Sequence, residues 1–164
     1  MNTRLKSLSI FSAFTMLFVV AVGPAMAATF SMVSTSGNYE IGCDRELAVE
    51  IDVTGESSNS ADLVLYYDPA QIQLTDTDAA NPGVQLTNGD AFQAYAYSIN
   101  EGTGQIRVTG FNIVGNLTSK KTFIRIPFQA LPGATSATFD IEFLGIGQTL
   151  DSNIAIPGGT GGVN

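Results

Sequence analysis

Acidic side chains are the first candidates for chemistry, because two carboxylates can share acid and base roles, as in glycoside hydrolysis. Asp62, Asp140 and Glu142 stand at alternating strand positions, where charged side chains normally face water. The chain has no histidine, which removes the commonest general base and all histidine-based triads. Its single cysteine, Cys43, has no partner for an internal disulfide and no histidine to activate it. The sequence therefore predicts a protein that is not an enzyme.

One acidic loop carries the oxygen ligands that calcium prefers. Asp76, Asp78 and Asn81 follow the apolar segment Gln71–Leu74 within a few residues of one another. The spacing lacks the central glycine and the later glutamate of an EF-hand loop, and a solvated acidic turn is the alternative interpretation. Asp151 with Asn153 is a second, weaker candidate pair. No other cofactor is predicted.

Tyrosines could stack against sugar rings. Tyr95 and Tyr97 lie two residues apart, so they share one face of an extended strand, and Tyr66 could join them from another strand. The alternative is that this face is core, with the phenol oxygens hydrogen bonded inside. The chain has no tryptophan, which counts against a flat carbohydrate platform.

The N-terminus has the pattern of a secretory signal peptide. Arg4 and Lys6 precede the apolar run Leu8–Val22, and Ala25-Met26-Ala27 is a small-x-small cleavage site. We expect residues 1–27 to be removed on export, which predicts a secreted or cell-surface protein whose mature chain does not span the membrane. The mature chain would then contain five basic and fifteen acidic residues, which give a net charge of −10. This negative charge disfavours nucleic acid as a partner.

The elements that must position these residues are strands. Apolar and polar residues alternate in several short segments separated by turn residues such as Asn81-Pro82-Gly83 and Asn88-Gly89, and no amphipathic helix is evident. The expected strands are Leu47–Val53, Asp62–Tyr67, Gln71–Leu74, Phe92–Ile99, Gln105–Phe111, Phe123–Phe128 and Phe139–Phe143. Phe92–Ile99 and Gln105–Phe111 are expected to form a hairpin. This pattern indicates an all-β sandwich of two antiparallel sheets over residues 28–156, followed by a glycine-rich tail or linker at 157–164.

The segment Ala61–Pro69, followed by Ile72 and Leu74, resembles the hallmark strand of cohesin domains, in which an apolar strand ends in Tyr67-Asp68-Pro69. Leu47–Val53, Gly104–Val108 and Phe123–Ala130 are similar to other strands of that family in order and spacing. The resemblance implies a nine-stranded jelly-roll sandwich. It also implies a structural role for the tripeptide, with Tyr67 in the core, Asp68 organising the turn and Pro69 ending the strand.

The resemblance implies a function as well: non-catalytic docking of a dockerin-type protein, in scaffolding or surface adhesion linked to polysaccharide degradation. In the family one sheet face carries the partner site, and strand alternation places a set of side chains on that face here. They are Asp62, Val64, Tyr66, Arg107, Thr109, Asp140 and Glu142. Two other hypotheses stay open, a carbohydrate-binding module that uses Tyr66, Tyr95 and Tyr97, and a structural module of the cell surface.

Overall fold

The chain folds into strands alone over the part that can be described. The computed structural model describes residues 28–34, 40–143 and 152–155, and no helix long and apolar enough to cross a membrane occurs in these ranges. The strands are β1 (Thr29–Ser34), β2 (Arg45–Asp52), β3 (Ser60–Tyr67), β4 (Ile72–Leu74), β5 (Thr87–Asn88), β6 (Ala94–Asn100), β7 (Gln105–Phe111), β8 (Lys121–Ala130), β9 (Phe139–Ile141) and β10 (Asn153–Ala155).

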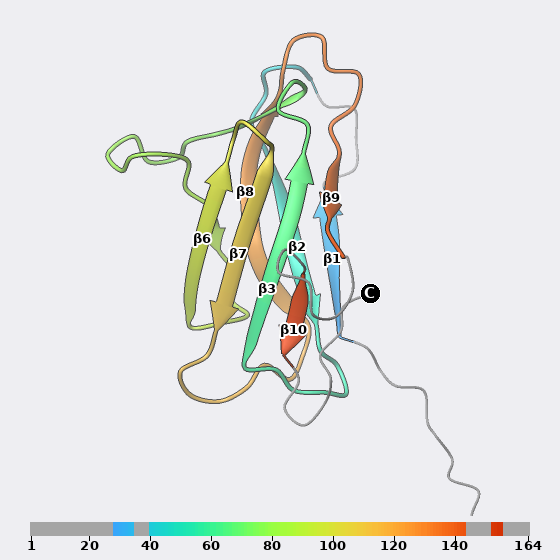
Figure 1. Cartoon of the computed structure of the whole chain (residues 1–164), viewed down its shortest axis with the longest axis vertical. Coiled ribbons are helices and arrows are strands. Elements are labelled where there is room, and N and C mark those ends of the chain that lie inside the picture. The colour runs from blue at the N-terminus through green and yellow to red at the C-terminus, as the bar shows by residue number, and fades with distance from the viewer. Residues whose placement is uncertain (1–27, 35–39, 144–151, 156–164) are drawn as a thin grey trace, which may run out of the picture.

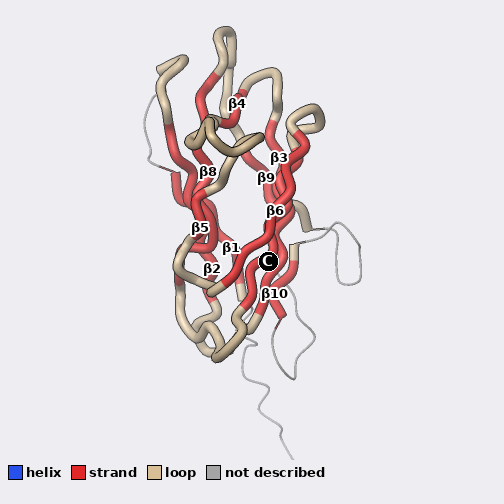
Figure 2. The backbone as a smooth tube through the Cα atoms, turned by 90° about the vertical axis from the view of Figure 1, so that its left-hand side faces the viewer, coloured by secondary structure: helices blue, strands red, loops and turns tan. Residues whose placement is uncertain are grey.

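Two antiparallel sheets face each other (Figures 1 and 2). One has the order β1-β2-β8-β4, with β5 also pairing with β8. The other has the order β10-β3-β7-β6, with β9 also pairing with β3. We call the second one the β3 sheet, because β3 lies at its centre.

Alternation along the strands builds the core between the sheets. Leu63 and Leu65 of β3 point inward to meet residues such as Val49 and Ile51 of β2, and all four are fully buried. The register between β2 and β8 shifts at Val49/Glu50, which gives β8 one extra residue, Phe123. A bulge of this kind lets neighbouring residues turn to the same side. Phe123 and Ile124 are accordingly both fully buried, although they are consecutive.

Phe123 is the centre of an aromatic group inside the sandwich. Its ring lies 5.2 Å from that of Phe30, 5.8 Å from Phe92 and 5.7 Å from Tyr95, measured between centroids. Gly110 of β7 makes room for this group, because a Cβ atom there would lie 2.6 Å from the Phe92 ring and 2.8 Å from the Phe123 ring. Any larger residue at position 110 would have to displace these rings.

Tyr67, Asp68 and Pro69 end β3 at a tight turn. The Tyr67 ring is buried against Phe139, with centroids 5.8 Å apart. The Asp68 carboxylate accepts hydrogen bonds from the Ala70 N–H and from Gln71 Nε2, each at 2.8 Å, and these bonds lower the pKa of Asp68. Gly104 supports the turn from the β6–β7 hairpin, where its carbonyl accepts the Tyr67 N–H at 2.8 Å.

The structure confirms the predicted jelly-roll sandwich of two antiparallel sheets and the β6–β7 hairpin. The described residues form ten strands, where nine were expected. The number of strands exceeds nine because two sheet edges are each formed by two short strands. β4 and β5 both pair with β8, and β9 and β10 both pair with β3. The expected signal peptide at 1–27 and tail at 157–164 lie outside the described residues.

Candidate functional site

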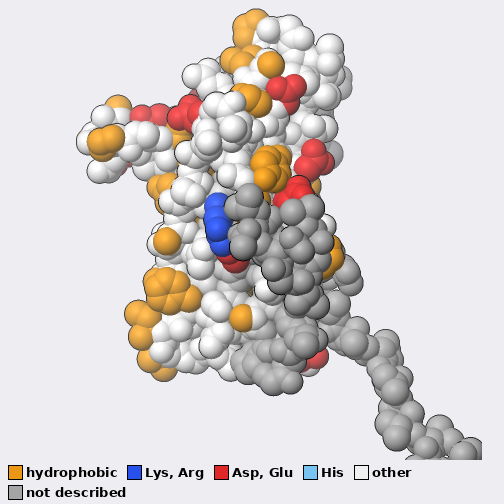
Figure 3. All heavy atoms as spheres, in the orientation of Figure 1, with side chains coloured by type: hydrophobic (Ala, Val, Ile, Leu, Met, Phe, Trp, Pro, Cys, Tyr) orange, Lys and Arg blue, Asp and Glu red, His pale blue; other side chains and the backbone are white. Residues whose placement is uncertain are grey.

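The candidate site is the outer face of the β3 sheet, the side turned away from the other sheet. Residues that pair across neighbouring strands share a face, so the register identifies its members. β3 contributes Asp62, Val64 and Tyr66, and β7 contributes Gln105, Arg107, Thr109 and Phe111. β6 contributes Ala94, Ala96, Ser98 and Asn100, β9 contributes Asp140, and β10 contributes Asn153. Figure 3 views this face and shows basic and acidic side chains close together near its middle.

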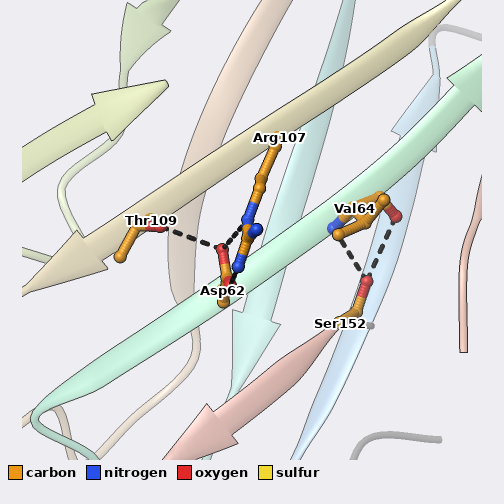
Figure 4. A network of polar contacts seen from close by, with 5 residues as sticks. All are labelled: Asp62, Val64, Arg107, Thr109 and Ser152. Carbon is orange, nitrogen blue, oxygen red and sulfur yellow. Dashed lines mark hydrogen bonds and ion pairs between the residues drawn. The ribbon is translucent and has the colours of Figure 1, made fainter. Parts of the chain in front are cut away.

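A polar network occupies the centre of this outer face (Figure 4). The Arg107 guanidinium forms an ion pair with the Asp62 carboxylate through two nitrogens, with Nε lying 3.2 Å from Oδ1. The Thr109 hydroxyl donates to the same Oδ1 at 2.9 Å. The hydrogen bond and the charge of Asp62 raise the pKa of Arg107 above its usual value. The fold therefore brings together three of the predicted site residues, Asp62, Arg107 and Thr109, and their polar groups hydrogen bond to one another.

Tyr66 and the acidic residues beyond it form a second part of the face. Gln105 Nε2 donates to the Tyr66 hydroxyl at 2.7 Å, across the β3–β7 pair. Asp140 pairs opposite Tyr66 on β9 and its side chain is exposed. Glu142 follows β9, and its N–H donates to the Val64 carbonyl at 2.9 Å. Asp140 and Glu142 thus add negative charge to one margin of the outer face.

Val64 departs from the expectation. Its place in β3 puts it on the same side as Asp62 and Tyr66, yet its side chain has no exposed surface. The expectation that Val64 contributes to an accessible partner surface is therefore corrected. Strand alternation assigns a side of the sheet and carries no information about what covers that side.

Ser152 completes the backbone hydrogen bonding beside Val64 (Figure 4). Its hydroxyl accepts the Val64 N–H at 2.9 Å and donates to the Val64 carbonyl at 3.1 Å. Its own N–H donates to the Glu142 carbonyl at 3.1 Å. Ser152 is buried, and its contacts with Val64 lie between the part of β3 that pairs with β9 and the part that pairs with β10.

An apolar tip borders the outer face where β7 ends, and Figure 3 shows hydrophobic side chains gathered at this lower left corner. We define the tip as Phe111, Ile113 and Val114. Ile113 and Val114 are 77% and 75% exposed, which is unusual for aliphatic side chains, and Phe111 is 41% exposed. Contiguous apolar patches on the surface of a soluble protein often mark a binding site.

The side chain of Gln93 holds the backbone of this tip in place. Its Oε1 accepts the N–H groups of Ile113 and Val114 at 3.0 and 3.2 Å, and its Nε2 donates to the Val114 carbonyl at 3.1 Å. The Gln93 N–H in turn donates to Asn112 Oδ1 at 3.1 Å. The apolar side chains are therefore displayed on a fixed backbone, which lowers the entropy lost on binding.

The three tyrosines proposed for carbohydrate stacking do not share a surface. Tyr66 lies on the outer face, whereas Tyr95 and Tyr97 pair with Gly110 and Val108 and so point to the inner side. Tyr95 packs in the aromatic group, its hydroxyl accepts the Phe92 N–H at 3.0 Å, and burial raises its pKa. The expected platform of Tyr66, Tyr95 and Tyr97 is therefore corrected, because the sheet separates its members.

The acidic loop is stabilised by its own hydrogen bonds. Asp76 Oδ1 accepts the Asp78 N–H at 2.9 Å, and the Asp78 carboxylate accepts the Ala80 N–H and an amide hydrogen of Asn81. Within the described ranges, no group of three or more His, Cys, Asp or Glu residues is placed to hold a metal ion. Asp151 of the second candidate pair lies outside the described residues.

Sequence reasoning missed the apolar tip, Gln93 and Gln105. The tip carries a signal in hindsight, because Ile113-Val114 is an apolar pair inside a turn-rich segment that contains Asn112, Gly115 and Asn116. Nothing local marks Gln93, since its partners lie 20 and 21 residues away.

No protein-family model and no curated protein matches the chain by sequence. Solved structures do match. A type II cohesin domain from the cellulosome of Acetivibrio cellulolyticus aligns with a TM-score of 0.63 and 11% identity, over 84% of this chain and 92% of that one. A type II cohesin in a cohesin–X–dockerin complex from the same organism aligns with a TM-score of 0.61 and 13% identity, over 84% and 93%.

A third match comes from another genus. The cohesin module of a family 33 glycoside hydrolase from Clostridium perfringens aligns with a TM-score of 0.59 and 9% identity, over 82% of this chain and 87% of that one. Each alignment spans both sheets, because it covers more than four fifths of the chain. The chain therefore has the fold of a cohesin module.

Proposed function

We propose that this chain is a non-catalytic, extracellular docking module that binds a dockerin-type protein through the outer face of the β3 sheet. The observation that carries the proposal is the pairing of two features on one surface. The polar centre consists of Asp62, Arg107 and Thr109, whose side chains hydrogen bond to one another. The rigid apolar tip borders the same face. Interfaces are commonly built in this way, with apolar anchors that supply energy and polar groups that set orientation.

The shape of the face supports the proposal. β6 presents small side chains to this surface, Ala94, Ala96 and Ser98, and the neighbouring strand β7 adds the Arg107 and Thr109 side chains that lie against Asp62. A polar sheet face with small side chains along one strand suits a helical or loop-built protein partner better than a single sugar chain, which needs a cleft or exposed rings. Asp140 and Glu142 would favour basic residues at that margin of the partner.

The fold likeness supports the same partner class, because cohesins with this fold have been solved in complex with dockerins. We further propose that residues 1–27 direct export and are then removed, and that residues 157–164 form a flexible tail or the start of a linker. Tethering through such a linker fits scaffolding or surface adhesion in a system that degrades polysaccharides.

The experiment is capture of secreted proteins from the source by the immobilised mature chain, with and without a calcium chelator. Docking predicts that a protein with a dockerin-like calcium repeat is retained, identified by mass spectrometry, and released by the chelator. The variant Asp62→Ala/Tyr66→Ala should lose this protein while keeping its unfolding midpoint in urea within a small margin. Ile113→Ser/Val114→Ser should weaken capture through the tip.

A matched control lies on the opposite sheet. Arg125 Nη1 contacts Glu46 Oε1 at 2.8 Å, in an ion pair whose arginine is about as exposed as Arg107, although Glu46 is more exposed than Asp62. Glu46→Ala/Arg125→Ala should therefore leave capture unchanged. An equal loss of partner capture in this control and in Asp62→Ala/Tyr66→Ala would show that the partner binds elsewhere. If the chain captured no protein but was retarded in a polysaccharide gel, carbohydrate binding would replace docking as the proposed function.

A further inference from the structure

Strand β6 forms one edge of the β3 sheet. Among the described residues it pairs with β7 alone, and in Figure 2 it runs along the side of the sandwich that faces the viewer. Natural edge strands are usually protected by charged residues, proline, bulges or shortness. β6 has the sequence AYAYSIN, with no charge and no proline over seven residues, and its register with β7 is continuous. It therefore offers an unprotected row of backbone donors and acceptors.

The other edges differ from β6. β9 and β10 have three residues each, and β9 contains Asp140. β4 also has three residues. β1 is uncharged, but its two ends adjoin ranges 1–27 and 35–39, which lie outside the described residues. β6 is thus a long, uncharged edge strand, and the structure describes the residues that precede and follow it.

We propose that β6 pairs antiparallel with β6 of a second copy of this chain, about a two-fold axis at Tyr97. A two-fold contact requires a surface that is complementary to itself. An axis at Tyr97 would place Ala96 opposite Ser98 of the other copy, and Tyr95 opposite Ile99. Small residues then meet small residues on the outer face, and large apolar residues meet on the inner side.

The exposure of Tyr97 supports this register. Tyr97 points to the inner side of the sheet, opposite the fully buried Val108, yet 39% of its surface remains accessible because it lies at the edge. In the proposed pairing the two Tyr97 rings lie side by side across the axis and cover each other. Directly opposed side chains in an antiparallel pair are close enough for such contact.

Charge also favours β6 as the contact. The chain carries a net charge of −8, so most pairs of surfaces on two copies would repel each other. β6 contains no ionisable acid or base other than tyrosine, and the nearest carboxylate along the chain, Glu101, would face the neutral position of Gln93 in the other copy. The contact therefore brings no like charges into register.

The pairing is independent of the proposed docking function, because it uses the edge of the sheet and leaves the outer face open. The two outer faces would lie on the same side of one sheet that continues across both copies. Failure of partner capture would leave the self-association prediction intact, and the reverse also holds.

The experiment is sedimentation equilibrium of the exported chain over a wide concentration range, with two matched double variants. Ala96→Glu/Ser98→Glu would place glutamate opposite glutamate in the paired strands, whereas Ala96→Lys/Ser98→Glu would place lysine opposite glutamate. Positions 96 and 98 are exposed, so both variants should keep the fold, which circular dichroism and urea unfolding would check. We expect the wild type and the lysine–glutamate variant to reach the mass of a dimer, and the glutamate–glutamate variant to stay a monomer.

Each outcome decides the proposal. A wild type that stays monomeric up to its solubility limit overturns it. Dimerisation of the glutamate–glutamate variant at the wild-type concentration shows that another surface is used. Loss of the dimer in both variants rules out the register about Tyr97.

Discussion

The hydroxyl of Ser152 occupies the position of a backbone peptide group beside Val64, since it both accepts the Val64 N–H and donates to the Val64 carbonyl. Val64 has no exposed surface, so water cannot take over these bonds. We expect Ser152→Ala to lower the free energy of unfolding by about 1–3 kcal/mol, the cost of an unsatisfied buried polar group. Urea denaturation measures this change. Ser119→Ala, at an exposed position, is the control and should change little.

Gly104 is expected to be intolerant of any side chain. Its φ is +67°, and a Cβ atom would lie 1.9 Å from the Tyr67 carbonyl oxygen, a backbone atom that cannot move freely. Gly104→Ala should cost more than the roughly 1–2 kcal/mol of the left-handed conformation alone. Gly102→Ala in the same turn is the matched control, because its Cβ would meet only Asn100 Oδ1 at 3.5 Å. Equal urea midpoints for the two variants would contradict the predicted clash.

The Asp62–Arg107 ion pair should contribute little to stability. The two side chains are 24% and 40% exposed, and pairs of this kind are worth about 0.2–1 kcal/mol. A double-mutant cycle with Asp62→Ala and Arg107→Ala measures the coupling free energy directly. A coupling well above this range would show that the pair supports the fold itself and that its variants are unsuitable for testing partner capture.

Gln93 should control the rigidity of the apolar tip. Gln93→Ala removes the acceptor of two amides, and we expect hydrogen exchange at Ile113 and Val114 to accelerate roughly tenfold, because the bonds contribute on the order of 1 kcal/mol each. Gln93→Glu keeps that acceptor and loses the bond to the Val114 carbonyl, so its effect should be smaller. Unchanged exchange in Gln93→Ala would show that the tip is held by other contacts.

Acid should weaken the turn after β3. The hydrogen bonds to Gln71 and Ala70 lower the pKa of Asp68 in the folded chain, so its stabilising contribution is present above about pH 4, the value of a free aspartate. That contribution is lost as the pH falls through the lowered pKa. Urea unfolding of the wild type and of Asp68→Asn should therefore converge in acid. A stability difference that does not vary with pH would contradict this assignment.

The sequence was sufficient for the layers of the fold. Alternation in Asp62–Tyr67 correctly separated Leu63 and Leu65 from Asp62 and Tyr66, because strand side chains change sides at every residue. The same rule could not foresee that Val64 is covered, or that Tyr95 and Tyr97 face inward, since those facts depend on neighbouring elements. The contact of Gln93 with Val114 and that of Ser152 with Val64 join residues 21 and 88 positions apart, and no local pattern encodes either.

One edge of β3 is covered by two separate strands, β9 and β10, in place of a single continuous one. β9 is fixed to Leu65–Tyr67 and β10 to Ser60–Asp62, each by its own register. Each strand therefore holds its own register, and a change in the pairing of one can leave the other in place.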